Sequence, residues 1–254
     1  MLEIIVVPVL SDNYVHVAHD PASGVTAIVD PAVPDAPLNA AVERGWTVTH
    51  ILNTHHHGDH VGGNMAIKSR TGATIVGPAA DAARIPGIDV ALADGETYDL
   101  GGNVGHVFDV PGHTRGHIAF WFPDSSALFC GDTLFALGCG RLFEGTPDQM
   151  WRSLNKLRAL PDETRVYCAH EYTQANARFA LTVDPGNEAL IDYANDVDAA
   201  RAAGRFTVPA LLGREKMANP FLRADDPALA ANVDRDVSDP VSVFAEVRHR
   251  KDVF

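Results

Sequence analysis

The stretch NTHHHGDH, residues 53–60, carries five side chains that can bind a metal within six positions: His55, His56, His57, Asp59 and His60. The preceding run VTHILNT (48–54) predicts a strand, and residues 64–70 predict a helix. The cluster therefore lies where a strand passes into a helix. A catalytic zinc ion uses three protein ligands and keeps one position open, so five donors exceed what one ion needs.

Strand geometry separates these five side chains. If the chain stays extended after the strand, His55, His57 and Asp59 face one side, and His56 faces the other. His60 reaches the same region from the turn that starts the next helix. We therefore expect His56 to be a bystander and the other four to bind metal.

Three more donors follow predicted strands further along the chain. VFDVPGHTRGH (107–117) offers His113, LFCGDT (128–133) offers Asp132, and VYCAHEY (166–172) offers His170. Strand ends can converge at one edge of a sheet, where loops build sites on a rigid scaffold. His117 is too close to His113 to be needed as a ligand, and we expect it to support the site by a hydrogen bond.

The complete donor set suits two metal ions. It comprises His55, His57, Asp59, His60, His113, Asp132 and His170. If Asp132 bridges the two ions, His55, His57 and His113 complete the ligand set of one ion. Asp59, His60 and His170 then complete the other. A carboxylate is the natural bridge, because it has two oxygens and a neutral imidazole has one lone pair. Zinc is the expected metal, with iron and manganese as alternatives that accept the same ligands.

The composition limits the class of partner. The chain has 254 residues and a net charge of −13, so it should repel nucleic acid and anionic membranes. No apolar run approaches the roughly 18 residues that span a bilayer, and the apolar start lacks a basic n-region. Three cysteines without a CxxC pair fit a reducing compartment. We expect a cytoplasmic monomer that binds a small molecule.

The pattern of elements predicts two domains. Short β-branched runs alternate with helices at 34–44 and 148–159 up to about residue 172. Alanine-rich segments at 173–182, 187–203 and about 226–233 then predict helices. The expected organisation is an α/β domain over residues 1–172 and a helical domain over 173–254.

Several motifs resemble known families. THHHGDHVGGN (54–64), PGHTRGH (111–117), CGDTLF (130–135) and CAHEYT (168–173) resemble the metallo-β-lactamase superfamily. This implies an αββα sandwich with a dinuclear metal site over residues 1–172, followed by the small all-α C-terminal domain. SDNY (11–14), residues 131–154, NPFLR (219–223) and VRHRKDVF (247–254) are similar to hydroxyacylglutathione hydrolases, the type II glyoxalases.

The finer resemblance implies a thioesterase. Its substrate would be S-D-lactoylglutathione, hydrolysed to D-lactate and glutathione in the second step of methylglyoxal detoxification, with the helical domain closing over glutathione. The family's glutathione contacts fall on Arg141, Tyr172, Arg248 and Lys251. Arg141 stands where the family often has Lys, and Phe143 stands where it often has Tyr and so lacks the phenolic hydrogen bond. Local cations would attract this anionic substrate to an acidic chain.

The expected catalytic groups are Asp132 and Asp59, acting with a metal-bridging hydroxide that attacks the thioester carbonyl. The leaving thiol has a pKa of about 8.5, so no strong general acid is needed. The nearest alternative is a glutathione persulfide dioxygenase with one iron held by two His and one Asp. A lactonase or β-lactamase, a nuclease and a non-catalytic metal-binding module are further alternatives. Metal content and oxygen consumption distinguish the dioxygenase from the thioesterase.

Overall fold

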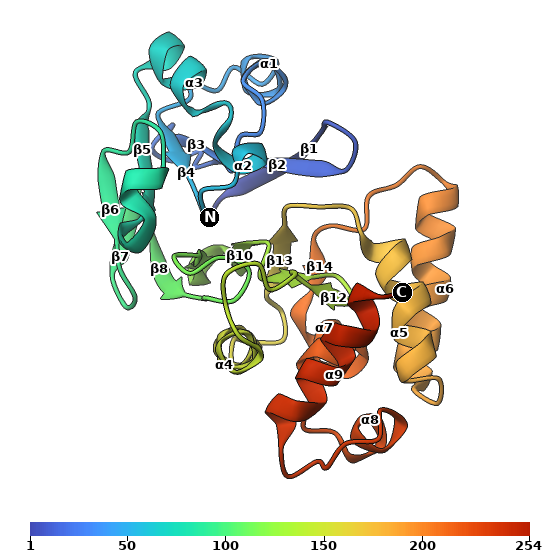
Figure 1. Ribbon diagram of the computed structural model, residues 1–254. Helices are drawn as coiled ribbons and strands as arrows, with labels where there is room; N and C mark the ends of the chain where they lie inside the picture. Colours follow the sequence, from blue (N-terminus) through green and yellow to red (C-terminus); the bar gives the residue numbers. More distant parts are fainter. The chain divides into compact units, whose positions relative to one another are not determined.

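The computed structural model describes residues 1–254 and divides them into two compact units (Figure 1). Unit 1 comprises Met1–Asp109 and Arg115–Gly131. Unit 2 comprises Val110–Thr114 and Asp132–Phe254. None of the helices is both long enough and apolar enough to cross a membrane.

Unit 1 begins with a six-stranded sheet in which the strands follow chain order. The first three strands are antiparallel, and the third to the sixth are parallel. The strands are β1 (Glu3–Val9), β2 (Asn13–His19), β3 (Thr26–Val29), β4 (His50–Leu52), β5 (Thr74–Pro78) and β6 (Val90–Leu92). The helical segments are α1 (Asp35–Val42), α2 (Gly58–Val61), α3 (Asn64–Thr71), η1 (Ala79–Arg84) and η2 (Pro123–Ser125). The predicted helices at 34–44 and 64–70 are confirmed as α1 and α3.

Four antiparallel strands of unit 1 form a second layer. They are β7 (Thr97–Leu100), β8 (Asn103–Asp109), β9 (Ile118–Phe122) and β10 (Ala127–Gly131). Every residue of β2 is buried, because its two faces meet different layers. On one face Val17 packs with Ala41 of α1 and Ile67 of α3, which lie on one side of the first sheet in Figure 1. On the other face the ring of His16 lies 5.8 Å from Phe129 of β10.

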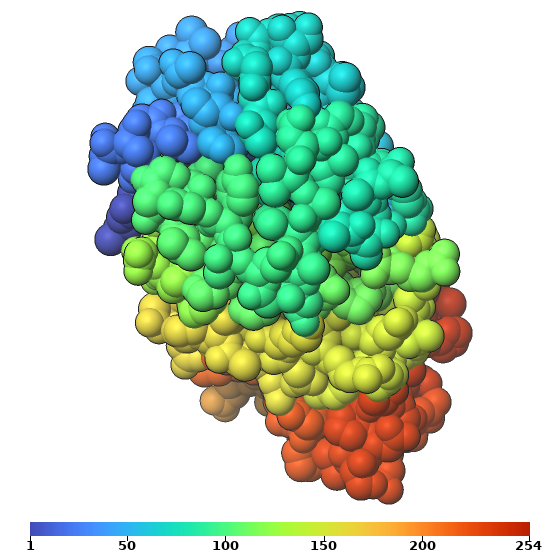
Figure 2. Space-filling model, turned by 90° about the vertical axis from the view of Figure 1, so that its left-hand side faces the viewer, coloured from blue at the N-terminus to red at the C-terminus, as the bar shows by residue number.

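Unit 2 is mainly helical. Its strands are β11 (Leu134–Phe135), β12 (Gly138–Cys139), β13 (Arg165–Cys168) and β14 (Ala210–Leu211). Its helices are α4 (Pro147–Arg158), α5 (Thr173–Val183), α6 (Glu188–Ala202), α7 (Leu212–Ala218), η3 (Pro220–Leu222), α8 (Pro227–Asn232) and α9 (Pro240–Asp252). Helices α8 and α9, red in Figure 2, pack against each other. The predicted helices α4, α5, α6 and α8 are confirmed within one residue at each end, whereas α7 and α9 were not predicted.

All three cysteines are buried, and none forms a disulfide. Burial raises the pKa of the Cys139 thiol to about 11 and that of Cys168 to about 12. Neither thiol is therefore appreciably ionised near neutral pH.

A buried carboxyl group in unit 2 gives a pH-dependent stability. Glu215 of α7 is fully buried, and burial raises its pKa from 4.5 to about 7. Between these two pH values the folded protein keeps a proton that the unfolded chain has lost. The free energy of unfolding should therefore fall as pH rises from about 4.5 to 7, by on the order of 3 kcal/mol.

Replacing Glu215 by Gln should remove this component, because the amide does not titrate. Urea unfolding of the metal-free protein at pH 5 and pH 8 measures it. We expect wild type to lose about 3 kcal/mol more than Glu215→Gln over this interval. Parallel pH profiles for the two proteins would contradict the raised pKa.

Candidate metal centre

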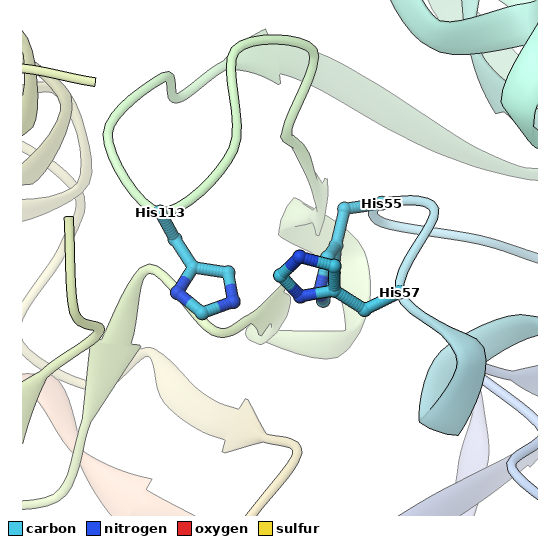
Figure 3. A group of neighbouring side chains, drawn as sticks. All are labelled: His55, His57 and His113. Atoms are coloured by element: carbon cyan, nitrogen blue, oxygen red, sulfur yellow. The ribbon is translucent and has the colours of Figure 1, made fainter. Parts of the chain in front are cut away.

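The loop after β4 carries the first donors of unit 1. His55 Nε2 and His57 Nδ1 are 3.1 Å apart, as expected for side chains on the same side of an extended segment. Figure 3 shows both rings on this loop. His56 is placed elsewhere, with its Nδ1 3.1 Å from Asp81 Oδ2 and its Nε2 bonded to Arg84. Asp81 and Arg84 lie outside the candidate donor set, and that His56 is a bystander stays a prediction.

The other two donors of unit 1 lie in α2. His60 Nε2 is 3.6 Å from Asp59 Oδ2, and Asn13 Nδ2 donates to the same carboxylate oxygen (3.0 Å). His60 Nδ1 donates to Asp30 Oδ2 at 3.1 Å, which directs Nε2 toward Asp59. Asp30 also accepts from Thr54 N (2.8 Å) and Thr54 Oγ1 (2.6 Å). Sequence analysis missed Asp30, although its position directly after β3 matches that of the other strand-end donors.

The residues that pack against these imidazoles, His117 and Gly131, lie close to the loop after β4. His117 stacks on His55 with ring centroids 4.5 Å apart, and its Nδ1 lies 3.0 Å from Ile118 O. Gly131 is required here. A Cβ at this residue would lie 2.2 Å from Thr54 Oγ1, and its φ of +48° disfavours side chains.

Unit 2 brings together the other three predicted donors. His113 Nε2 lies 3.3 Å from Asp132 Oδ2, and His170 Nε2 lies 3.5 Å from Asp132 Oδ1. His113, labelled in Figure 3, donates from Nδ1 to Arg141 O at 2.9 Å, which leaves its Nε2 lone pair available toward Asp132. Each oxygen of the Asp132 carboxylate thus faces a different imidazole, as a bridging ligand requires.

These separations are those expected for pairs of side chains that bind the same divalent cation. Zinc ligands lie about 2.0–2.2 Å from the ion, so two tetrahedral ligands are roughly 3.4 Å apart. The donor pairs of unit 1 are separated by 3.1 and 3.6 Å, and those of unit 2 by 3.3 and 3.5 Å. In unit 1, ligand atoms of Asp30, His55 and His60 also lie within 4.8 Å of one another. Buried imidazoles and carboxylates of this kind are typical ligands of zinc, iron and manganese.

A group of cations lies near the donors of unit 2. Arg248 is only 5% exposed and donates to Cys139 O (2.9 Å) and to Asp252 Oδ1 (2.9 Å). Arg141 Nε lies 3.7 Å from the same Asp252 oxygen. Burial lowers the pKa of Lys251, followed in effect by repulsion from Arg248, Arg178 and Arg141. Arg178 was not singled out from the sequence, because it becomes a neighbour only when α5 and α9 pack.

Two aromatic side chains border the same donors. Tyr172 is 38% exposed, and its ring stacks on His170 at 4.8 Å with an angle of 3°. Phe143 is 63% exposed and lies 5.2 Å from the ring of His113. Both therefore present ring surface to solvent beside an imidazole of the candidate donor set.

The family models divide the chain in two. Residues 20–170 match the metallo-β-lactamase superfamily, and residues 171–254 match the C-terminus of hydroxyacylglutathione hydrolase. The fold is the αββα sandwich of the metallo-β-lactamase superfamily followed by a helical region, which confirms the expected fold class. The donor sets define a metal-binding member of that superfamily.

Individual relatives identify the family within this superfamily. A hydroxyacylglutathione hydrolase from Methylococcus capsulatus is 61% identical, over 100% of this chain and 99% of its own length. The chain belongs to the hydroxyacylglutathione hydrolase family. Among solved structures, ETHE1 from Myxococcus xanthus is 25% identical and has a TM-score of 0.69, over 96% of this chain and 90% of its own. TTHA1623 in a di-iron-bound form is 28% identical and has a TM-score of 0.54, over 65% of this chain and 90% of its own.

Proposed function

We propose that the protein hydrolyses S-D-lactoylglutathione to D-lactate and glutathione, as the second step of methylglyoxal detoxification. The observation that carries this is the gathering of cations beside the donors of unit 2 in an otherwise acidic protein. A glutathione thioester has a carbonyl for the metal centre and carboxylates for the cations. The full-length similarity to hydroxyacylglutathione hydrolases supports the same substrate. Residues 1–172 would supply the catalytic domain, and residues 173–254 would bind glutathione.

The donor residues would hold two divalent ions, which we propose are zinc. His55, His57 and His113 would bind one ion, Asp59, His60 and His170 the other, and Asp132 both. When bound, the ions supply hydroxide at neutral pH and polarise the thioester carbonyl. Asn13 donates to Asp59 Oδ2 at 3.0 Å and so holds this carboxylate in place, from where Asp59 would help to orient the attacking hydroxide.

The cations would recognise the glutathione part of the substrate. Arg141 lies two residues after β12, Lys251 lies on α9, and Arg178 lies nearby on α5. Together these cations would offset the repulsion between an acidic chain and an anionic substrate. Tyr172 and Phe143 offer exposed rings at the edge of the donor set. Arg248 would add positive charge to this group from a buried position, where its guanidinium is bonded to Cys139 O and Asp252.

Thiol release from S-D-lactoylglutathione tests this function. Protein of measured metal content should hydrolyse the thioester. A chelator should lower the rate at least roughly 100-fold, because the attacking water then regains its ordinary pKa. Added Zn²⁺ should restore turnover.

The lactoyl thioester of a small neutral thiol is the matched control substrate. It keeps the carbonyl and lacks the glutathione carboxylates, so we expect a raised KM and a similar kcat. Protein that holds two ions and leaves S-D-lactoylglutathione intact would refute the proposed substrate. Oxygen uptake with glutathione persulfide would then identify the dioxygenase alternative.

A further inference from the structure

The segment that follows Asp132 is a tight hairpin. Strands β11 and β12 pair Leu134 with Cys139 and Phe135 with Gly138, which leaves two residues in the turn. Leu137 in this turn has a φ of +55°, a conformation that costs free energy for a leucine. A turn of this kind persists only where its surroundings hold it.

This hairpin contacts all three donors of unit 2. It begins two residues after Asp132. Gly140, which directly follows the return strand, is so close that a Cβ there would lie 2.0 Å from Asp132 O. At its end, Arg141 O accepts the hydrogen bond of His113 Nδ1 (2.9 Å). In its first strand, the ring of Phe135 meets His170 edge-on at 5.9 Å. A shift of the hairpin would therefore move or release each donor.

Buried polar side chains of α5 and the α7–η3 junction bind the hairpin backbone. Asn219 Nδ2 lies 3.1 Å from both Phe135 O and Gly138 O. Glu215 Oε2 accepts from Leu137 N at 2.8 Å. Asn176 Nδ2 donates to Ala136 O at 3.1 Å. Four consecutive residues of the hairpin thus each have a peptide group bonded to a helical side chain.

The binding side chains also fix one another. Glu215 and Asn219 are fully buried, and Asn219 Nδ2 donates to Glu215 Oε2 at 2.9 Å. Tyr193 OH donates to Glu215 Oε1 at 2.8 Å. Burying a carboxyl group is costly, and apolar side chains of similar size would fill the space at lower cost. A satisfied buried network of this kind specifies one arrangement of the groups that it binds.

We propose that Glu215, Asn219 and Asn176 are positioning residues for the metal centre, which hold the 134–139 hairpin and through it Asp132, His113 and His170. The inference rests on the proposed function, because it takes these three residues as metal ligands. It gives the helical part of the chain a second task beside substrate binding.

Metal affinity tests the proposal without substrate. Glu215→Leu and Asn176→Ala each remove one hydrogen bond to the hairpin. Asn219→Asp removes the Nδ2 donor that faces Phe135 O and Gly138 O, and it keeps the acceptor that caps Phe221 N. We expect each variant to bind Zn²⁺ about 10- to 100-fold more weakly in competition with a chelator. With Co²⁺ as the probe, visible absorption should change in position and intensity, because the ligand geometry changes.

Asn155→Ala is the matched control for Asn176→Ala. It removes one hydrogen bond from an amide side chain to a backbone oxygen, Trp151 O within α4, and Asn155 is not part of the network that binds the hairpin. Its Zn²⁺ affinity and Co²⁺ spectrum should match those of wild type. If Asn219→Asp does not fold, Asn176→Ala, which loses one hydrogen bond, carries the test. Folded Glu215→Leu and Asn176→Ala proteins with wild-type affinity and spectrum would overturn the proposal. Wild-type protein that binds two ions but no thioester would refute the proposed function and leave the positioning role intact.

Discussion

Replacing Asp132 by Ala should abolish binding of both ions and lower thioester turnover by at least roughly 10³-fold. Asp132 is the only carboxylate in the donor set of unit 2. Its Oδ2 faces His113 Nε2 at 3.3 Å, and its Oδ1 faces His170 Nε2 at 3.5 Å. Alanine leaves these imidazoles without a shared anionic partner, so the loss falls on both proposed ions at once.

Elemental analysis after dialysis, together with kcat, measures this effect. Asp132→Asn keeps the shape and one oxygen acceptor, so we expect partial metal content between those of Ala and wild type. Asp162→Ala is a suitable control, since this exposed carboxylate in the same unit pairs with Lys216 away from the donors. An Asp132→Ala protein with two ions per chain and wild-type turnover would rule out the bridging role.

Replacing Asp30 by Ala should destabilise the metal-free protein by on the order of 3–5 kcal/mol. The carboxylate is 3% exposed and accepts hydrogen bonds from Thr54 N, Thr54 Oγ1 and His60 Nδ1. Alanine leaves these buried donors without their acceptor. It must also adopt a φ of +51°, which Asp tolerates better than Ala.

Urea unfolding measures the loss, and metal content shows whether His60 keeps its orientation. Asp30→Asn retains one oxygen acceptor but turns an NH₂ group toward a donor, so its stability should lie between those of wild type and Asp30→Ala. Asp35→Ala removes an exposed carboxylate close in sequence and controls for charge. If Asp30→Ala has the same urea midpoint of unfolding as wild type, the hydrogen bonds of Asp30 contribute little to stability.

The relative directions of His55, His56 and His57 were predictable from sequence because the signal is local. The alternation of His55, His56 and His57 along an extended segment gives their directions, and the structure pairs His55 with His57 and turns His56 to Asp81. Helix α4 was equally accessible. Its capping box joins Thr146 and Gln149, three residues apart, at the start of an amphipathic segment.

Features that depend on distant partners were not predictable. Asp30 ends a strand like many turn residues, and its role appears only when Thr54, 24 residues later, returns beside it. Helix α9 was missed because its last turn is strongly basic and resembles a solvated tail. Its Arg248 is buried by a contact with Cys139, 109 residues earlier. Helix α7 is only seven residues long, too short for a clear periodic pattern.

The burial of the cysteines has a consequence for the chemical setting in which the protein would work. The proposed product is a thiol, so the enzyme would act in a pool of glutathione and its disulfide. Disulfide exchange requires an accessible thiolate. Cys139 and Cys168 are shielded from solvent and keep their protons at neutral pH. Cys130 is buried as well. None of the three cysteines offers a point of attachment for glutathione, so catalysis would not be coupled to the redox state of its own product.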